Sequence, residues 1–122
     1  MGHIKRLSLL LLIPLLLLAC EKQSHTVRYE VEGSVPEIGV SYKNGTNGNE
    51  SADLQSGWSK EFVVESYYHL HLRVNTKNSD GTATCRIYID GELAAEATAT
   101  GKFKHAACNK LPVPPTPETD SQ

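Results

Sequence analysis

Two histidines with one residue between them are the side chains in this sequence best suited to bind a metal ion. On an extended strand alternate side chains project from the same face, so the imidazoles of His69 and His71 would point the same way. A catalytic zinc needs a third protein ligand, which His105, Glu61 or Glu65 would have to supply from a neighbouring strand. Since no local spacing fixes such a ligand, we predict no metal site and interpret both histidines as solvated.

Motifs of other catalytic classes are absent from the sequence. A Gly-x-Ser-x-Gly step does not occur, and neither does a phosphate-binding loop or a dinucleotide fingerprint. Glu30 and Glu32 share one face of a predicted strand, but nothing around them in the sequence desolvates or pairs them, so we interpret them as surface charge. We therefore predict that the protein is not an enzyme and holds no cofactor.

The first of three cysteines ends an apolar segment. Basic residues precede a leucine-rich run from Leu7 to Leu18, which is too short to span a membrane and is typical of a secretory signal peptide. The run closes in Leu-Leu-Ala-Cys at Cys20, which resembles the bacterial lipobox. We expect residues 1–19 to be a lipoprotein signal peptide, Cys20 to be acylated and residues 20–25 to form a tether. The alternative is an ordinary signal peptide with an incidental cysteine.

The other two cysteines, Cys85 and Cys108, form an even pair in the mature chain. A signal peptide implies an oxidising compartment, where such a pair is expected to form a disulfide. Two free thiols or a metal-binding pair are the alternatives, but close Cys-x-x-Cys spacing and a paired-histidine motif beside it are both missing.

Charge limits the partners that the protein can have. The chain carries 12 Lys and Arg against 14 Asp and Glu, and removal of the signal peptide takes away two of the basic residues, Lys5 and Arg6. An excess of negative charge argues against nucleic acid or anionic lipid headgroups as the main partner. The membrane contact that we expect is the lipid on Cys20.

Alternation of apolar and polar residues predicts strands through the middle of the chain. In the clearest stretch, Thr82 to Glu92, the side chains of Cys85, Ile87 and Ile89 share one face, and Asp90-Gly91 signals a tight turn. We interpret this stretch as a central strand. Further strands are predicted at residues 27–32, 38–42, 58–65, 69–75, 92–100 and 103–108, with a short one around Leu54.

The turn at Asp90-Gly91 leaves the register of its two strands open. A two-residue loop would set Ile89 opposite Glu92. It would also place Leu93 opposite Tyr88, so that apolar residues would face polar ones. A longer loop or a β-bulge would instead bring Ile89 and Leu93 together.

These strands and the turns between them indicate an all-β fold. We predict a two-sheet antiparallel sandwich of immunoglobulin-like build over residues 26–111, with about seven strands and one disulfide. Residues 112–122 are rich in proline and end in polar side chains, which predicts a disordered tail.

Several motifs resemble the mycobacterial small membrane protein family, MmpS. In the second half of the chain these are Gly81 to Gly91, with its Cys-Arg-Ile-Tyr-Ile-Asp-Gly step, Ala99-Thr100-Gly101 and Ala107-Cys108. In the first half they are Val27 to Ser34, Ile38 to Tyr42 and Trp58 to Phe62, so the resemblance covers about residues 26–108. It implies a periplasmic β-sandwich with a disulfide that assists transporters of the resistance-nodulation-division class in lipid or siderophore export and drug efflux, and it implies no catalytic residues. A family member would carry a transmembrane helix, where this chain carries a lipobox-like motif.

We therefore expect a lipid-anchored binding or accessory module of the bacterial cell envelope that faces the periplasm. The sequence does not decide between anchoring in the inner and in the outer membrane. Its expected partners are the membrane, through the anchor, and an envelope protein such as an export transporter. One alternative is a metal-binding protein or metal-dependent hydrolase that uses His69 and His71. The other is a structural or adhesin-type sandwich lipoprotein.

Overall fold

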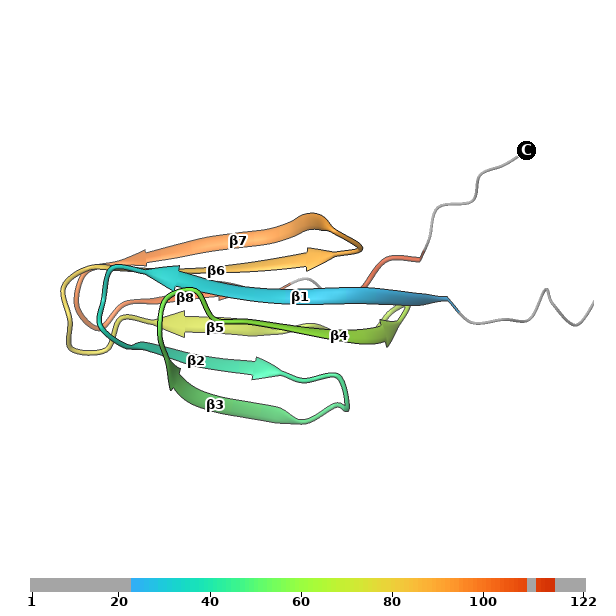
Figure 1. Cartoon of the computed structure of the whole chain (residues 1–122), viewed down its shortest axis with the longest axis horizontal. Coiled ribbons are helices and arrows are strands. Elements are labelled where there is room, and N and C mark those ends of the chain that lie inside the picture. Colours follow the sequence, from blue (N-terminus) through green and yellow to red (C-terminus); the bar gives the residue numbers. More distant parts are fainter. Residues whose placement is uncertain (1–22, 110–111, 116–122) are drawn as a thin grey trace, which may run out of the picture.

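The computed structural model describes residues 23–109 and 112–115. These residues form eight β-strands in two antiparallel four-stranded sheets that pack face to face (Figure 1). The described part of the chain is thus an all-β sandwich, as predicted, with eight strands where about seven were expected. No helix in the described residues is long and apolar enough to cross a membrane.

The two sheets share the strands equally. The first sheet has the order β4-β1-β6-β7 and consists of β1 (Ser24–Gly33), β4 (Ser59–Glu65), β6 (Thr82–Ile89) and β7 (Glu92–Thr100). The second has the order β3-β2-β5-β8 and consists of β2 (Ile38–Lys43), β3 (Asn49–Leu54), β5 (Leu72–Asn75) and β8 (His105–Cys108). The stretch interpreted as a central strand is indeed interior, because β6 lies between β1 and β7.

Strict alternation on β1 and β6 builds one wall of the core. The buried residues of the two strands lie opposite one another in register, as Val27 with Ile89, Tyr29 with Ile87, and Val31 with Cys85. Residues between them point to the outer face because side chains on a strand alternate with a period of two. The second sheet supplies the facing wall from its own buried residues, Ile38, Val40, Tyr42, Leu72 and Val74.

Cys85 and Cys108 form the predicted disulfide, which joins β6 of one sheet to β8 of the other. Both cysteines are buried, and their Cα atoms lie 6.2 Å apart, within the range usual for a disulfide. The bond therefore crosses the core and links the two layers covalently.

The β6–β7 hairpin has the two-residue loop that was one of the two predicted alternatives. Asp90 and Gly91 have φ angles of 52° and 84°, the positive values that a type I′ turn requires. Ile89 lies opposite Glu92, as such a loop demands.

A β-bulge follows this loop and restores the pattern of the strand. Leu93 lies opposite Tyr88, but Ile87 lies opposite Ala95, so Ala94 is the extra residue. The bulge does not bring Ile89 and Leu93 together, and it leaves the Leu93 side chain 51% exposed. Beyond it the alanines of β7 pack against the core.

The segment before β5 differs from the prediction. A strand was expected at residues 69–75, but β5 begins at Leu72 and residues 69–71 precede it. The backbone of Tyr67 has a φ of 71°, and the residues after it first bond elsewhere, because Tyr67 and Tyr68 pair with Val113 and not with β2. Leu70 is nonetheless fully buried, so the apolar alternation of the prediction holds.

Both ends of the described chain contribute more to the fold than expected. β1 begins at Ser24 and includes His25, which was assigned to the tether. Val113 was assigned to the tail but is fully buried, since its N–H donates to the Tyr68 carbonyl at 2.9 Å and its carbonyl accepts from the Tyr67 N–H at 2.7 Å. The signal peptide, Cys20, the first part of the tether and residues 116–122 lie outside the described residues.

Replacing both cysteines, Cys85→Ala with Cys108→Ala, is expected to lower the free energy of unfolding by about 3 kcal/mol. The disulfide closes a loop with a sequence separation of 23 residues and so restricts the unfolded chain. Urea denaturation without reductant measures the difference. Dithiothreitol should destabilise the wild type and leave the variant unchanged, and a variant as stable as the wild type would contradict this role.

Candidate functional site

Within the described part of the chain, the predicted metal candidates are not joined by a third ligand. His69 is exposed, and Nδ1 of His71 lies 2.7 Å from Oδ1 of Asn109. Glu61 and Glu65 lie on β4, in the other sheet. His105 pairs with Asn75, at the far end of β5 from the two histidines. No group of three or more His, Cys, Asp or Glu side chains among the described residues is arranged to hold a metal ion.

His25, which the sequence analysis did not single out, is the centre of a buried polar cluster. Its side chain is 3% exposed. Nδ1 of the imidazole lies 2.7 Å from Oδ2 of Asp90, and Nε2 lies 2.8 Å from Oγ of Ser66. We call His25, Ser66 and Asp90 the His25 clip. It joins the start of β1, the residue after β4 and the β6–β7 turn.

The order of the strands explains why these three residues meet. β1 lies between β4 and β6, so its first residues are flanked by the end of β4 and by the β6–β7 turn. At that turn the Asp90 N–H donates to the Thr26 carbonyl at 2.8 Å, and the Thr26 N–H donates to Oδ1 of Asp90 at 2.9 Å. The hydrogen bond from His25, and after it the one from the Thr26 N–H, lowers the pKa of Asp90 below its usual value.

A carboxylate, an imidazole and a hydroxyl in this order are also the parts of a serine hydrolase triad. Such an enzyme needs donors for the oxyanion, usually backbone N–H groups beside the nucleophile. Here the Ser66 N–H donates to the Gln23 carbonyl at 3.3 Å, and the Tyr67 N–H donates to the Val113 carbonyl at 2.7 Å. The two N–H groups nearest the hydroxyl are thus already used within the protein.

The surroundings of Ser66 also argue against a role as a nucleophile. The hollow beside it is lined by Gln23, Glu65, Tyr67 and Pro115, so an acidic residue borders the space where a negative charge would develop. The Ser66 hydroxyl also donates to Oε1 of Gln23 at 3.3 Å. The geometry therefore fits a structural fastening of three strands better than a nucleophile.

One signal in the sequence could have placed His25 on the buried face, although not in the cluster. His25 has the same parity as Val27, Tyr29 and Val31, so extension of the strand pattern by two residues places it on the buried face. The Asp-Gly turn signal marked the position of Asp90. Nothing in the local sequence indicated that Ser66 would complete the cluster.

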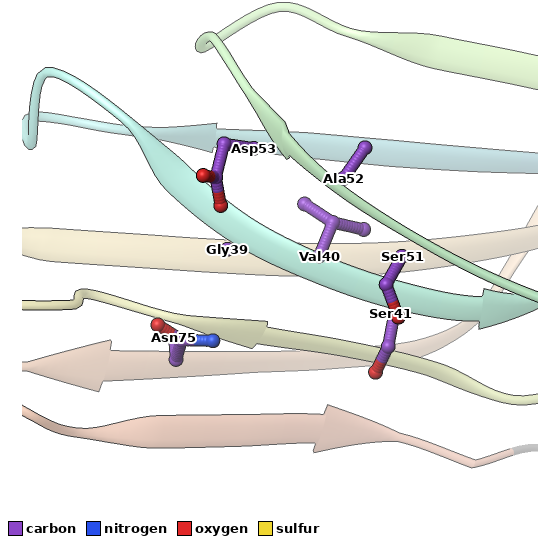
Figure 2. Close-up of a pocket in the computed structure, with 7 residues that line it drawn as sticks. All are labelled: Gly39, Val40, Ser41, Ser51, Ala52, Asp53 and Asn75. Carbon is purple, nitrogen blue, oxygen red and sulfur yellow. The ribbon is translucent and has the colours of Figure 1, made fainter.

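A second feature is a shallow polar groove on the outer face of the second sheet. Figure 2 shows Gly39 between Asp53 and Asn75, with Ser41 and Ser51 further along the strands. A Cβ atom at Gly39 would clash with the Asn75 amide, so a larger residue here would force that side chain to move. The remaining lining residues are Val40 and Ala52.

Asp53, the charged residue that lines this groove, is already paired with a lysine. Nζ of Lys77 lies 2.6 Å from Oδ2 of Asp53 and 3.6 Å from Oε1 of Glu37. The hydrogen bond to Asp53 raises the pKa of Lys77. The groove is therefore a satisfied polar surface, and we assign no ligand to it.

No protein-family model matches the chain, and no curated protein matches it significantly. The resemblance to the MmpS family consequently stays an expectation based on the motifs, and the predicted lipidation residue, Cys20, lies outside the described residues.

Replacing Asp90 by asparagine is expected to lower the free energy of unfolding by about 1 kcal/mol at neutral pH, because two donors lose a charged acceptor that is half exposed. Folding lowers the pKa of Asp90, so its contribution is present above the pKa of the unfolded chain, about 4, and is lost as the pH falls through the lower folded value. Urea denaturation at several pH values measures it.

Wild type and Asp90→Asn should therefore differ in stability at neutral pH and converge in acid below the folded pKa. Asp80→Asn, at an exposed turn position, serves as the matched control and should change little at any pH. A loss of stability in Asp90→Asn that is equal at neutral and acid pH would contradict the assignment.

A fluorophosphonate probe, which reacts with activated serine hydroxyls, is expected to leave Ser66 unlabelled. The reason is that the backbone donors needed beside an oxyanion are bonded elsewhere. Mass spectrometry of the full chain after exposure to the probe measures the labelling. An adduct on Ser66 that disappears in His25→Ala would overturn the structural role and establish a nucleophile.

Proposed function

We propose that this protein is a lipid-anchored, periplasm-facing module of a bacterial envelope that binds other envelope proteins and does not transform a substrate. The observation that carries the proposal is the buried Cys85–Cys108 disulfide, in a chain that opens with a lipobox-like signal. Disulfides persist in oxidising compartments outside the cytoplasm. Acylation of Cys20 would hold the domain at a membrane surface.

The His25 clip supports an anchored arrangement. β1 begins at Ser24, four residues after Cys20, and four extended residues span at most about 14 Å. A pulling force on the lipid anchor at Cys20 would therefore act on the first residues of β1 through a very short connection. There His25 is bonded to the β6–β7 turn and to Ser66, so the force would be shared by three strands. The domain would stay folded while held close to the bilayer.

An export transporter is the partner that the motifs favour. The resemblance to the MmpS family, from Val27 to Cys108, implies an accessory protein of a transporter of the resistance-nodulation-division class. In such a role the acyl chains on Cys20 would replace the transmembrane helix of a family member. The protein would then supply a rigid binding surface next to the transporter.

Cys20→Ala is expected to move the protein from the membrane fraction of bacterial cells to the soluble fraction, because the acyl chains are lost. Detergent phase partitioning and intact-mass measurement report the change. Chemical crosslinking in intact cells should also give adducts with a membrane transporter, with the yield falling roughly tenfold or more in Cys20→Ala as the effective concentration drops.

Ser24→Ala, four residues further on, is the matched control for Cys20→Ala and should behave as the wild type. A Cys20→Ala protein that stays in the detergent phase would contradict the lipid anchor. Crosslinks confined to soluble proteins would contradict the proposed partnership.

A further inference from the structure

The turn between β7 and β8 exposes an aromatic ring between two lysines. Phe103 is 67% exposed, and Lys102 and Lys104 on either side are exposed as well. We call these three residues the cationic tip. β7 ends, and the tip follows, at the end of the sandwich opposite to the start of β1 (Figure 1).

Thr76, a fully buried residue, fixes the conformation of the tip. Its hydroxyl donates to the Gly101 carbonyl and accepts from the Lys104 N–H at 3.0 Å, and its own N–H donates to the Lys104 carbonyl at 3.0 Å. The Phe103 N–H donates to the Lys77 carbonyl at 2.7 Å. A turn that is held in this way before binding loses little conformational entropy when a partner docks.

The backbone of Phe103 is held in an unusual conformation. Its φ of 58° lies in the left-handed region, which a bulky side chain rarely adopts. Such residues persist only where their surroundings impose the conformation, and they are concentrated at binding and catalytic sites. Here the hydrogen bonds of the turn impose it, and the ring projects into solvent instead of joining the core.

The lysines of the tip are available to a partner. No carboxylate in the described residues lies within ion-pair distance of Lys102 or Lys104, whereas nearby Lys77 pairs with Asp53 and Glu37. The outer face of the first sheet is acidic instead, with Arg28 and Arg86 paired to the more numerous carboxylates of Glu30, Glu32, Glu61 and Glu96. The tip is therefore a cationic spot on an acidic protein.

We propose that the cationic tip docks into a protein partner through an apolar pocket rimmed by carboxylates. Phe103 would fill the pocket as a buried aromatic anchor, and the two lysines would pair with the rim. This inference deepens the proposed function, because anchoring through Cys20 presents the opposite end of the sandwich to a neighbouring protein. The ten residues of β1 separate the two ends by roughly 30 Å, so the bilayer that holds the anchor is not the natural occupant.

The test places a photoreactive residue at the tip of the full-length protein in its native envelope. Phe103→p-benzoylphenylalanine is expected to crosslink to one protein, at a peptide that combines apolar residues with Asp or Glu. Lys102→Glu with Lys104→Glu should lower the adduct yield by about tenfold or more, and Lys102→Arg with Lys104→Arg should preserve it.

Tyr67→p-benzoylphenylalanine is the matched control. Tyr67 is 63% exposed and also has a positive φ, but it follows β4 at the end where β1 begins. It should not capture the same peptide. Adducts mainly with lipid, equal capture from both positions, or a yield that charge reversal leaves unchanged would each overturn the inference. The membrane fraction of the same samples reports the anchor, so a failed anchor and a failed tip are distinguished.

Discussion

The covalent link between β6 and β8 secures the weakest part of this small sandwich. β8 has four residues and pairs with β5 alone, at the edge of its sheet. A strand so short is marginal by itself, and the bond from Cys108 to Cys85 ties it to an interior strand of the opposite layer. The turn that carries Phe103 leads directly into β8, and hydrogen bonds from Thr76 hold that turn in place.

At the start of β1, hydrogen bonds have a role similar to that of the disulfide at β8. The His25 clip holds the first residues of β1 against two neighbouring elements, and Val113 adds backbone pairing to the segment after β4. The first and last parts of the described chain are thus both fastened to the core. This arrangement suits a domain that is held at one end and makes contacts at the other.

Much of the fold could be predicted because its signals are local. Alternation along β1, β2, β4 and β6 predicted those strands, and the Asp90-Gly91 signal predicted the turn between β6 and β7. The even number of cysteines in the mature chain predicted the disulfide. The later start of β5 was missed because Tyr67 and Tyr68 pair with Val113, a residue that was assigned to the tail.

The clip and the tip could not be predicted, because both depend on contacts between distant parts of the chain. His25 and Asp90 are 65 residues apart, and only the strand order brings them together. In the sequence Thr76 is an ordinary turn residue. Its role follows only from its hydrogen bonds to Gly101 and Lys104 in the β7–β8 connection. The metal hypothesis for His69 and His71 assumed a regular strand, but the structure places both residues before β5 and His71 next to Asn109.

The most direct test of this interpretation is thiol trapping in living bacteria that express the full chain. Cells are quenched with acid, alkylated and digested without reductant, and the peptides that contain Cys85 and Cys108 are identified by mass spectrometry. We predict one disulfide-linked pair, as expected for an oxidised domain outside the cytoplasm. Recovery of both cysteines as alkylated free thiols would contradict it.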